Sequence, residues 1–171
     1  MSRASRIIPN KLSGDAKNPP PAILGTVAKH PHLLEPMLKF SSALAAGVLP
    51  RRSSEILALR TAWNCRSELE WGHHVRYGVD ADLTADEIDR LAGGLPEVDW
   101  GTEDASLIRA ADELFEDQDI SDETWRVLTE SWDEAQLVEI VFVVGQYTML
   151  SMVAKATGVP IDSALPGFPS S

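Results

Sequence analysis

The chain has 171 residues, of which 26 are acidic and 15 are basic, and its formal net charge is −11. This length fits one domain that buries a hydrophobic core of its own. The excess of negative charge argues against binding to nucleic acids or anionic membranes, because basic patches supply most of the affinity for both. The single cysteine, Cys65, excludes an internal disulfide and a CxxC redox pair.

The longest apolar runs, residues 43–49 and 140–145, are much shorter than the roughly 18 residues needed to span a bilayer. The basic residues near the N-terminus are not followed by an apolar stretch, so no secretory signal is predicted. We therefore expect a cytoplasmic protein with no membrane partner.

Residues 1–21 are predicted to form an extended N-terminal arm. Gly14, Asn18 and the three prolines at 19–21 oppose a helix, and consecutive prolines favour an extended polyproline conformation. Such an arm is suited to lie across a neighbouring subunit. Residues 22–160 are expected to form the folded domain, and residues 161–171 a C-terminal tail.

Helical spacing of apolar residues recurs through the domain, and the alternation typical of strands is hard to find. The sequence therefore predicts an all-α bundle of about seven helices. A short helical turn is expected before Pro36, and a second helix from Pro36 to about residue 47. Further helices are expected over about 54–65 and 66–79.

Capping signals place the later helices. Thr84 and Glu87 form a capping box that opens a helix ending at 93–94, and residues 95–102 follow as a loop. Another helix is expected over 105–115. Ser121 begins the next, and a second capping box, Ser131 with Glu134, is predicted to open a long helix that ends at Gly158.

Glu70 and His74 are four residues apart on one predicted helix and share a face, to which Ser67 also belongs. A carboxylate one turn from an imidazole can raise its pKa, which suits a general acid or base. An ordinary surface pair is the alternative. Glu55, near the start of the preceding helix, faces His74 if the two helices pack together; otherwise it only favours its own helix dipole.

No metal site is predicted. His73 and His74 are adjacent, so they point about 100° apart around a helix. Glu70 and His74 supply only two ligands, and there is no HExxH motif. The sequence also lacks a GxSxG elbow and a glycine-rich phosphate loop. Cys65 is expected to be a buried small hydrophobic residue, and Tyr147, inside an apolar helix, to reach a pocket or a buried partner.

Three consecutive segments, 51–60 (RRSSEILALR), 68–76 (ELEWGHHVR) and 82–88 (DLTADEI), resemble the carboxymuconolactone decarboxylase / alkylhydroperoxidase D superfamily. The family pattern is an RE-L-LR helix, a Y-E-W-x-x-H helix, and G-L-T/S-x-x-E-I at the start of the next. Residues 138–160 also resemble the larger members of this superfamily.

The resemblance maps the family histidine onto His74 and the family glutamates onto Glu70 and Glu55. In peroxidase members, cysteines stand seven and four residues before that histidine, and here those positions are Ser67 and Glu70. Cys65 is two residues out of register and has no resolving partner. Thiol peroxidase chemistry needs a thiolate and a second thiol, so this activity is disfavoured.

The resemblance implies an all-α protein that assembles as a homotrimer or homohexamer and needs no cofactor. It implies a lyase in which His74 protonates carbon as carbon dioxide leaves a small carboxylated or lactone substrate, with Glu70 or Glu55 orienting it. The expected substrate-binding residues are Ser67, Trp71, Tyr147 and Arg52. An anionic substrate needs a cation, for which the candidates are Arg51, Arg52, Arg60 and Arg76.

Two other functions remain open at this point. One is a thiol peroxidase that uses Cys65. The other is a non-catalytic oligomeric binding protein with a vestigial pocket.

Overall fold

The computed structural model of the chain describes residues 5–13, 20–93 and 100–169, and these ranges contain eight α-helices and no strand. The all-α prediction is therefore confirmed, with one helix more than the seven expected. Gly14, Asn18, Pro19 and most of the loop predicted at 95–102 lie outside the described residues. The helices are α1 (Ala22–Val27), α2 (Pro31–Ala45), α3 (Arg51–Asn64), α4 (Glu68–Asp80), α5 (Ala85–Leu91), α6 (Thr102–Glu116), α7 (Asp122–Ser131) and α8 (Glu134–Thr157).

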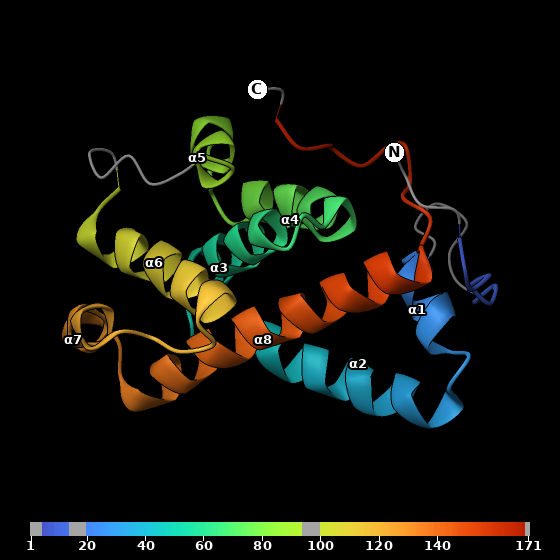
Figure 1. The fold of residues 1–171 in the computed structure, drawn as a ribbon, viewed down its shortest axis with the longest axis horizontal. Helices are drawn as coiled ribbons and strands as arrows, with labels where there is room; N and C mark the ends of the chain where they lie inside the picture. Colours follow the sequence, from blue (N-terminus) through green and yellow to red (C-terminus); the bar gives the residue numbers. More distant parts are fainter. Residues whose placement is uncertain (1–4, 14–19, 94–99, 170–171) are drawn as a thin grey trace.

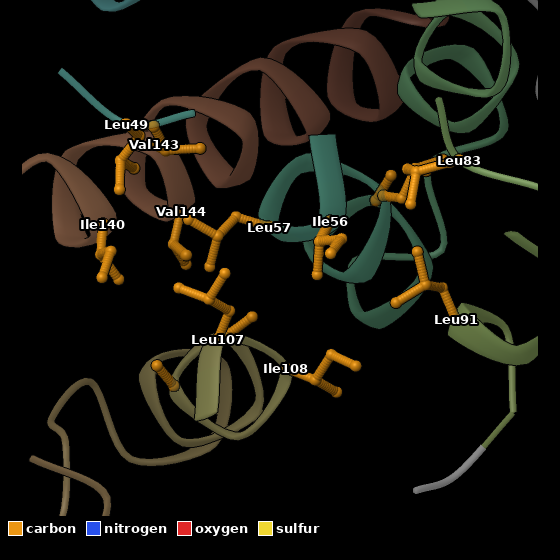
Figure 2. Packing of buried hydrophobic residues seen from close by; sticks show 14 of the residues in the cluster. Leu49, Ile56, Leu57, Leu83, Leu91, Leu107, Ile108, Ile140, Val143 and Val144 are labelled. Atoms are coloured by element: carbon orange, nitrogen blue, oxygen red, sulfur yellow. The ribbon is translucent and has the colours of Figure 1, made fainter. Parts of the chain in front are cut away.

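Helix α3 is the centre of the molecule, and α4, α6 and α8 pack around it (Figure 1). Its residues from Glu55 to Ala62 are all buried. Figure 2 shows Ile56 and Leu57 of α3 facing the buried side chains of α6 and α8. The side chains labelled there on α6 and α8 are Leu107, Ile108, Ile140, Val143 and Val144.

Two predictions near the N-terminus are wrong. Helix α1 was not expected, and the helix expected to start at Pro36 instead begins at Pro31 and runs through Pro36. Pro31 occupies the first turn, where proline is well tolerated because its missing N–H has no helical partner. Pro36 removes one interior hydrogen bond, but the helix continues on both sides of it.

The capping signals give mixed results. The Thr84–Glu87 box is confirmed, and Ser121 accepts the hydrogen bond from the backbone N–H of Thr124 as a helix cap should. The Ser131–Glu134 box is wrong, because Ser131 is the last residue of α7. Helix α8 is capped instead by Asp133 and Gln136, two residues further along, in a reciprocal pair of hydrogen bonds at 2.9 and 3.0 Å.

The described part of the N-terminal arm lies on its own chain. The backbone N–H groups of Arg6 and Ile7 donate to the carbonyl of Thr157 at the end of α8, and that of Asn10 donates to Gly25 in α1. The arm therefore joins the first and last helices of the domain.

The C-terminal tail packs against α4. The indole N–H of Trp71 donates to the carbonyl of Gly167 at 3.0 Å, and Arg76 donates to the carbonyl of Ala164 at 2.6 Å. The ring of Phe168 contacts that of Trp71. A Cβ on Gly72 would collide with Leu165, so glycine permits this close approach.

Helix α8 is the only described helix long and apolar enough to cross a membrane by length and composition. Its most apolar 18-residue window has a mean hydropathy of 1.7, but half of that window is buried within the protein. The core helix of a soluble protein has the same properties, so this finding is weak evidence for a membrane span.

Glu139 is a buried carboxylate in the second turn of this apolar helix, and it holds the turn between α2 and α3. Its two oxygens accept hydrogen bonds from the backbone N–H groups of Val48 at 2.6 Å and Leu49 at 3.2 Å. A Cβ on Gly47 would collide with the carboxylate, so the turn needs glycine there. The buried charge is thus satisfied by backbone donors.

Replacing Glu139 with alanine should lower the free energy of unfolding by about 2–3 kcal/mol, because two backbone donors lose a charged acceptor. Urea unfolding followed by circular dichroism measures this change. The control is Glu130→Ala, which removes an exposed ion pair with Arg126 and should change stability by less than about 1 kcal/mol. Equal effects of the two variants would contradict the role given to Glu139.

Candidate active site

A hydrogen bond between α3 and α4 forms the centre of the candidate site. Nδ1 of His74 lies 2.6 Å from Oε2 of Glu55, which accepts the bond, and both residues are buried. The two positions are 19 residues apart in sequence. Of the two alternatives for Glu55, the one in which it faces His74 is confirmed, and His74 is not part of an ordinary surface pair.

The turn between α3 and α4 produces this pairing. Cys65 ends α3, Arg66 adopts a left-handed conformation with φ of 52°, and the N–H of Ser67 donates back to the carbonyl of Ala62. This tight reversal sends α4 back along α3. Glu55, at the start of α3, is thereby brought opposite His74 in the middle of α4.

Helix α8 supplies a third side of the site through Tyr147. Its ring meets the imidazole of His74 edge to face, with centroids 4.3 Å apart. Burial, followed by the nearby carboxylate of Glu55, raises the pKa of Tyr147 above its ordinary value. The phenol therefore keeps its proton at neutral pH, as expected for a hydroxyl that donates a hydrogen bond.

Glu70 is 5% exposed on the same face of α4 as His74. Burial raises the pKa of the Glu70 carboxyl above its usual range, and the nearby His74 partly opposes this rise. Ser67 lies one turn before Glu70 and is 1% exposed. Its hydroxyl has no hydrogen-bond partner among the described residues, although it stands at the start of α4.

Tyr77 also contacts His74, edge to face with centroids 5.4 Å apart, and its ring lies nearly parallel to that of His73. The sequence did not mark Tyr77 as a site residue, although it lies three residues after His74 on the same helix. Beyond it, His73 and Asp162 line a surface cleft of about 780 Å³ between α4, the start of α1 and the C-terminal tail. The sequence could not predict this cleft, because the tail forms one of its walls.

Arg52 is not brought into contact with these residues. Its guanidinium donates to Glu87 at 2.6 Å and to Asp104 at 2.9 Å, so it joins α3 to α5 and α6. The hydrogen bond with Arg52 is the main cause that lowers the pKa of Glu87, to about 2. The structure therefore gives Arg52 a role that competes with binding of a substrate.

Two other arginines proposed for anion binding also have protein partners. Arg60 binds both carboxylate oxygens of Asp112 as well as the carbonyls of Leu91 and Gly93. Arg76 is held by the C-terminal tail. Trp71 is 1% exposed and packs in the core, where it also anchors that tail.

Cys65 is buried, as expected for a small hydrophobic residue. Its sulfur lies 3.9 Å from the hydroxyl of Thr148, and its carbonyl accepts a hydrogen bond from Lys155 at 2.6 Å. No group of three or more histidine, cysteine or acidic side chains is placed to hold a metal ion in the described part of the chain.

Comparison with known proteins identifies the fold. No protein-family model and no curated protein matches the sequence. Among solved structures, an AhpD-type antioxidant defence protein of unknown function from Agrobacterium tumefaciens is 12% identical, with a TM-score of 0.74 over 80% of this chain and 94% of that one.

Two further solved structures are similar over most of their length. A peroxidase-related protein from Silicibacter sp. TM1040 has a TM-score of 0.76 at 15% identity, covering 87% of this chain and 81% of its own. The debrominase Bmp8, in complex with 2,3,4-tribromopyrrole, has a TM-score of 0.72 at 13% identity, covering 84% of this chain and 78% of its own. The chain thus has the AhpD-like helical fold, in agreement with the resemblance seen in the sequence.

Replacing Glu70 with glutamine should stabilise the protein at neutral pH. The folded-state pKa of Glu70 is raised from 4.5, so above that pH the folded protein retains a proton that the unfolded chain has lost. The contribution of Glu70 to stability therefore falls as pH rises from 4.5 towards the folded pKa. The neutral amide lacks this dependence, so its advantage over wild type should grow across that window.

Urea unfolding at a series of pH values from 4.5 to neutral measures the difference between the two proteins. A difference that stays constant with pH would show that the Glu70 carboxyl is not destabilised by burial.

Proposed function

We propose that the protein is a general acid–base enzyme, a decarboxylase-like lyase that acts on a small carboxylated or lactone substrate. The observation that carries this proposal is the buried 2.6 Å hydrogen bond between Glu55 and His74. A buried carboxylate that accepts the hydrogen bond from Nδ1 fixes the orientation of the imidazole and leaves Nε2 for proton transfer. These are the properties of a histidine that gives and takes a proton.

Nε2 of His74 is the reacting atom in this proposal. Among the described residues, no hydrogen bond engages Nε2, whereas Nδ1 is held by Glu55. In the reaction, the bond between the substrate carbon and its carboxylate breaks, and carbon dioxide leaves. The electron pair remains on the conjugated carbon framework, and the proton on Nε2 moves to carbon. Solvent then restores the proton to His74.

Glu70 and Tyr147 would adapt the site to an anionic substrate. The raised pKa of Glu70 favours its neutral form, which reduces repulsion between this carboxyl and a carboxylated substrate. The phenol of Tyr147 and the unpartnered hydroxyl of Ser67 are candidate hydrogen-bond donors to substrate oxygens. Three of the four candidate arginines, Arg52, Arg60 and Arg76, have protein partners, so the neutral form of Glu70 would be important in limiting repulsion of the substrate.

The fold alone does not identify the reaction, because the similar structures include a peroxidase-related protein and a debrominase. A thiol peroxidase is disfavoured because the chain has one cysteine and that cysteine is buried. A non-catalytic binding protein would use the same residues to hold its ligand, so turnover distinguishes the two functions.

Replacing His74 with glutamine should reduce kcat by at least about 100-fold, because the proton donor is lost. Glutamine can still hydrogen-bond to Glu55, so the fold should be retained. The assay measures carbon dioxide release from a panel of small carboxylated lactones, and circular dichroism confirms the fold.

The matched control for this variant is His73→Gln, which changes the adjacent histidine on α4 and should leave kcat close to the wild-type value. Equal losses of kcat in the two variants would contradict the role of His74 as the proton donor. If wild type releases no carbon dioxide from any lactone but several shift its melting temperature, the protein is a binding protein.

Replacing Cys65 with serine should leave lyase turnover unchanged, because the sulfur contacts Thr148 and none of the residues assigned to the reaction. The same variant should match wild type in a hydroperoxide reduction assay, with both at background. Peroxide reduction by wild type that disappears in Cys65→Ser would contradict this reading and establish the thiol chemistry.

A further inference from the structure

The surface cleft beside α4 is distinct from the buried pair of Glu55 and His74, and its volume of about 780 Å³ is typical of a small-molecule site. One side of α4 forms its floor, through side chains that fall within a sector of about 100° around the helix. Residues 20–22 and the C-terminal tail, which runs from the end of α8 along α4 (Figure 1), form the other walls. The side chains of α4 in the cleft are Leu69, His73, Arg76, Tyr77 and Asp80.

Arg76 brings an uncompensated positive charge into this cleft. Its Nη2 donates to the carbonyl of Ala164 at 2.6 Å, and it forms no ion pair among the described residues. Arg52 and Arg60, by contrast, each bind a carboxylate. The carbonyl of the tail takes one of the several N–H groups that a guanidinium offers. The others remain available to an anion in the cleft.

Asp80 brings an uncompensated negative charge into the same cleft. It is the last residue of α4, where the helix dipole favours a cation and disfavours a carboxylate. An arginine and an aspartate four residues apart on a helix ordinarily pair, but Arg76 bonds to the tail instead. Within the ranges that the structure describes, the carboxylate of Asp80 has no partner. A cationic group bound in the cleft would satisfy both this carboxylate and the end of the helix.

The other polar side chains of the cleft have partners or carry no charge. Asp162 shapes the turn of the tail, because its Oδ1 accepts a hydrogen bond from the backbone N–H of Ala164 at 2.9 Å. Burial, followed by the charges of His74 and Arg76, lowers the pKa of His73. Its imidazole is therefore neutral at neutral pH. Arg76 is thus the one permanent cation among the residues that line the cleft.

This set of charges selects the kind of ligand. A purely anionic molecule would be repelled by Asp80 and Asp162, and a purely cationic one would cover Arg76 without pairing it. A zwitterion pairs both charges. Because a zwitterion is neutral overall, the net charge of −11 on the chain does not repel it.

The cleft also offers apolar surface next to these charges. Tyr77 lies between Arg76 and Asp80 on the same side of α4, and its side chain is 41% exposed. An aromatic ring of a ligand can stack on such a ring or meet it edge to face. The apolar walls around it are Leu69, Leu165, Pro21 and Pro160.

We propose that this cleft binds an α-amino acid with an aromatic side chain. The carboxylate of the ligand binds Arg76, its ammonium group binds Asp80, and its ring packs against Tyr77 and the apolar walls. The proposal does not depend on the reaction assigned to His74, because the cleft holds its ligand through other residues.

Isothermal titration calorimetry of the full chain with L-phenylalanine, L-tyrosine and L-tryptophan tests the proposal. At least one of them should bind saturably at one site per chain. The tightest ligand is then compared with the arylpropanoate that lacks its ammonium group and the arylethylamine that lacks its carboxylate. Each analogue should bind about tenfold more weakly than the amino acid, because it loses one charged hydrogen bond.

Two variants assign the two charges of the ligand. Arg76→Gln should weaken binding of the amino acid about tenfold and leave binding of the arylethylamine unchanged. Asp80→Asn should weaken binding of the amino acid by a similar factor and leave binding of the arylpropanoate unchanged. Arg76→Lys keeps the charge and should bind the amino acid more tightly than Arg76→Gln. The matched control is Asp89→Asn, which removes an exposed acid from α5 and should bind as wild type does.

Absence of saturable binding by all three amino acids would overturn the proposal. Analogues that bind as tightly as the amino acid would also overturn it, as would equal losses of affinity in Asp80→Asn and Asp89→Asn. If Arg76→Gln releases the tail and does not fold, the analogues and Asp80→Asn still decide the result. The assay measures binding and not turnover, so its outcome is independent of the proposed lyase activity.

Discussion

The hydrogen bond between Glu55 and His74 sets the constraint around which the rest of the site is arranged. Two ionisable groups removed from water are tolerated only when they are paired. The pairing needs α4 to run back along α3 at one fixed distance, which the tight turn at Cys65 to Ser67 provides. Tyr147 then packs against the third side of the pair. A displacement of α3 or α4 would leave a buried carboxylate without its partner.

Two buried or half-buried arginines of this acidic chain form ion pairs between helices. Arg52 and Arg60 sit on α3 and reach carboxylates on α5 and α6, so each ties the central helix to its neighbours. This use fixes the core but removes these guanidinium groups from ligand binding. In the proposed reaction, the neutral form of Glu70, which burial favours, would reduce repulsion of an anionic substrate.

Local patterns in the sequence predicted local features well. Most of the helices, the Thr84–Glu87 box and the common face of Glu70 and His74 follow from spacing alone, because they depend on neighbours three or four residues away. The exceptions are α1, the start of α2 and the cap of α8. Spacing does not decide whether Glu55 pairs with His74, since this depends on how two helices pack. For the same reason, the sequence does not reveal the partners of Arg52, because Glu87 and Asp104 come from helices far along the chain. The role of Glu139 as a cap for a distant turn has no local signal either.

The C-terminal tail contacts α4, which is the helix that carries His74. Trp71, on the same side of α4 as His74, contacts Gly167 and Phe168, and Arg76, on the opposite side, donates to the carbonyl of Ala164. The tail therefore packs directly against the helix that carries His74. In the proposed enzyme, substitutions in residues 164–168 would act on the site through α4, without changing any residue assigned to the reaction.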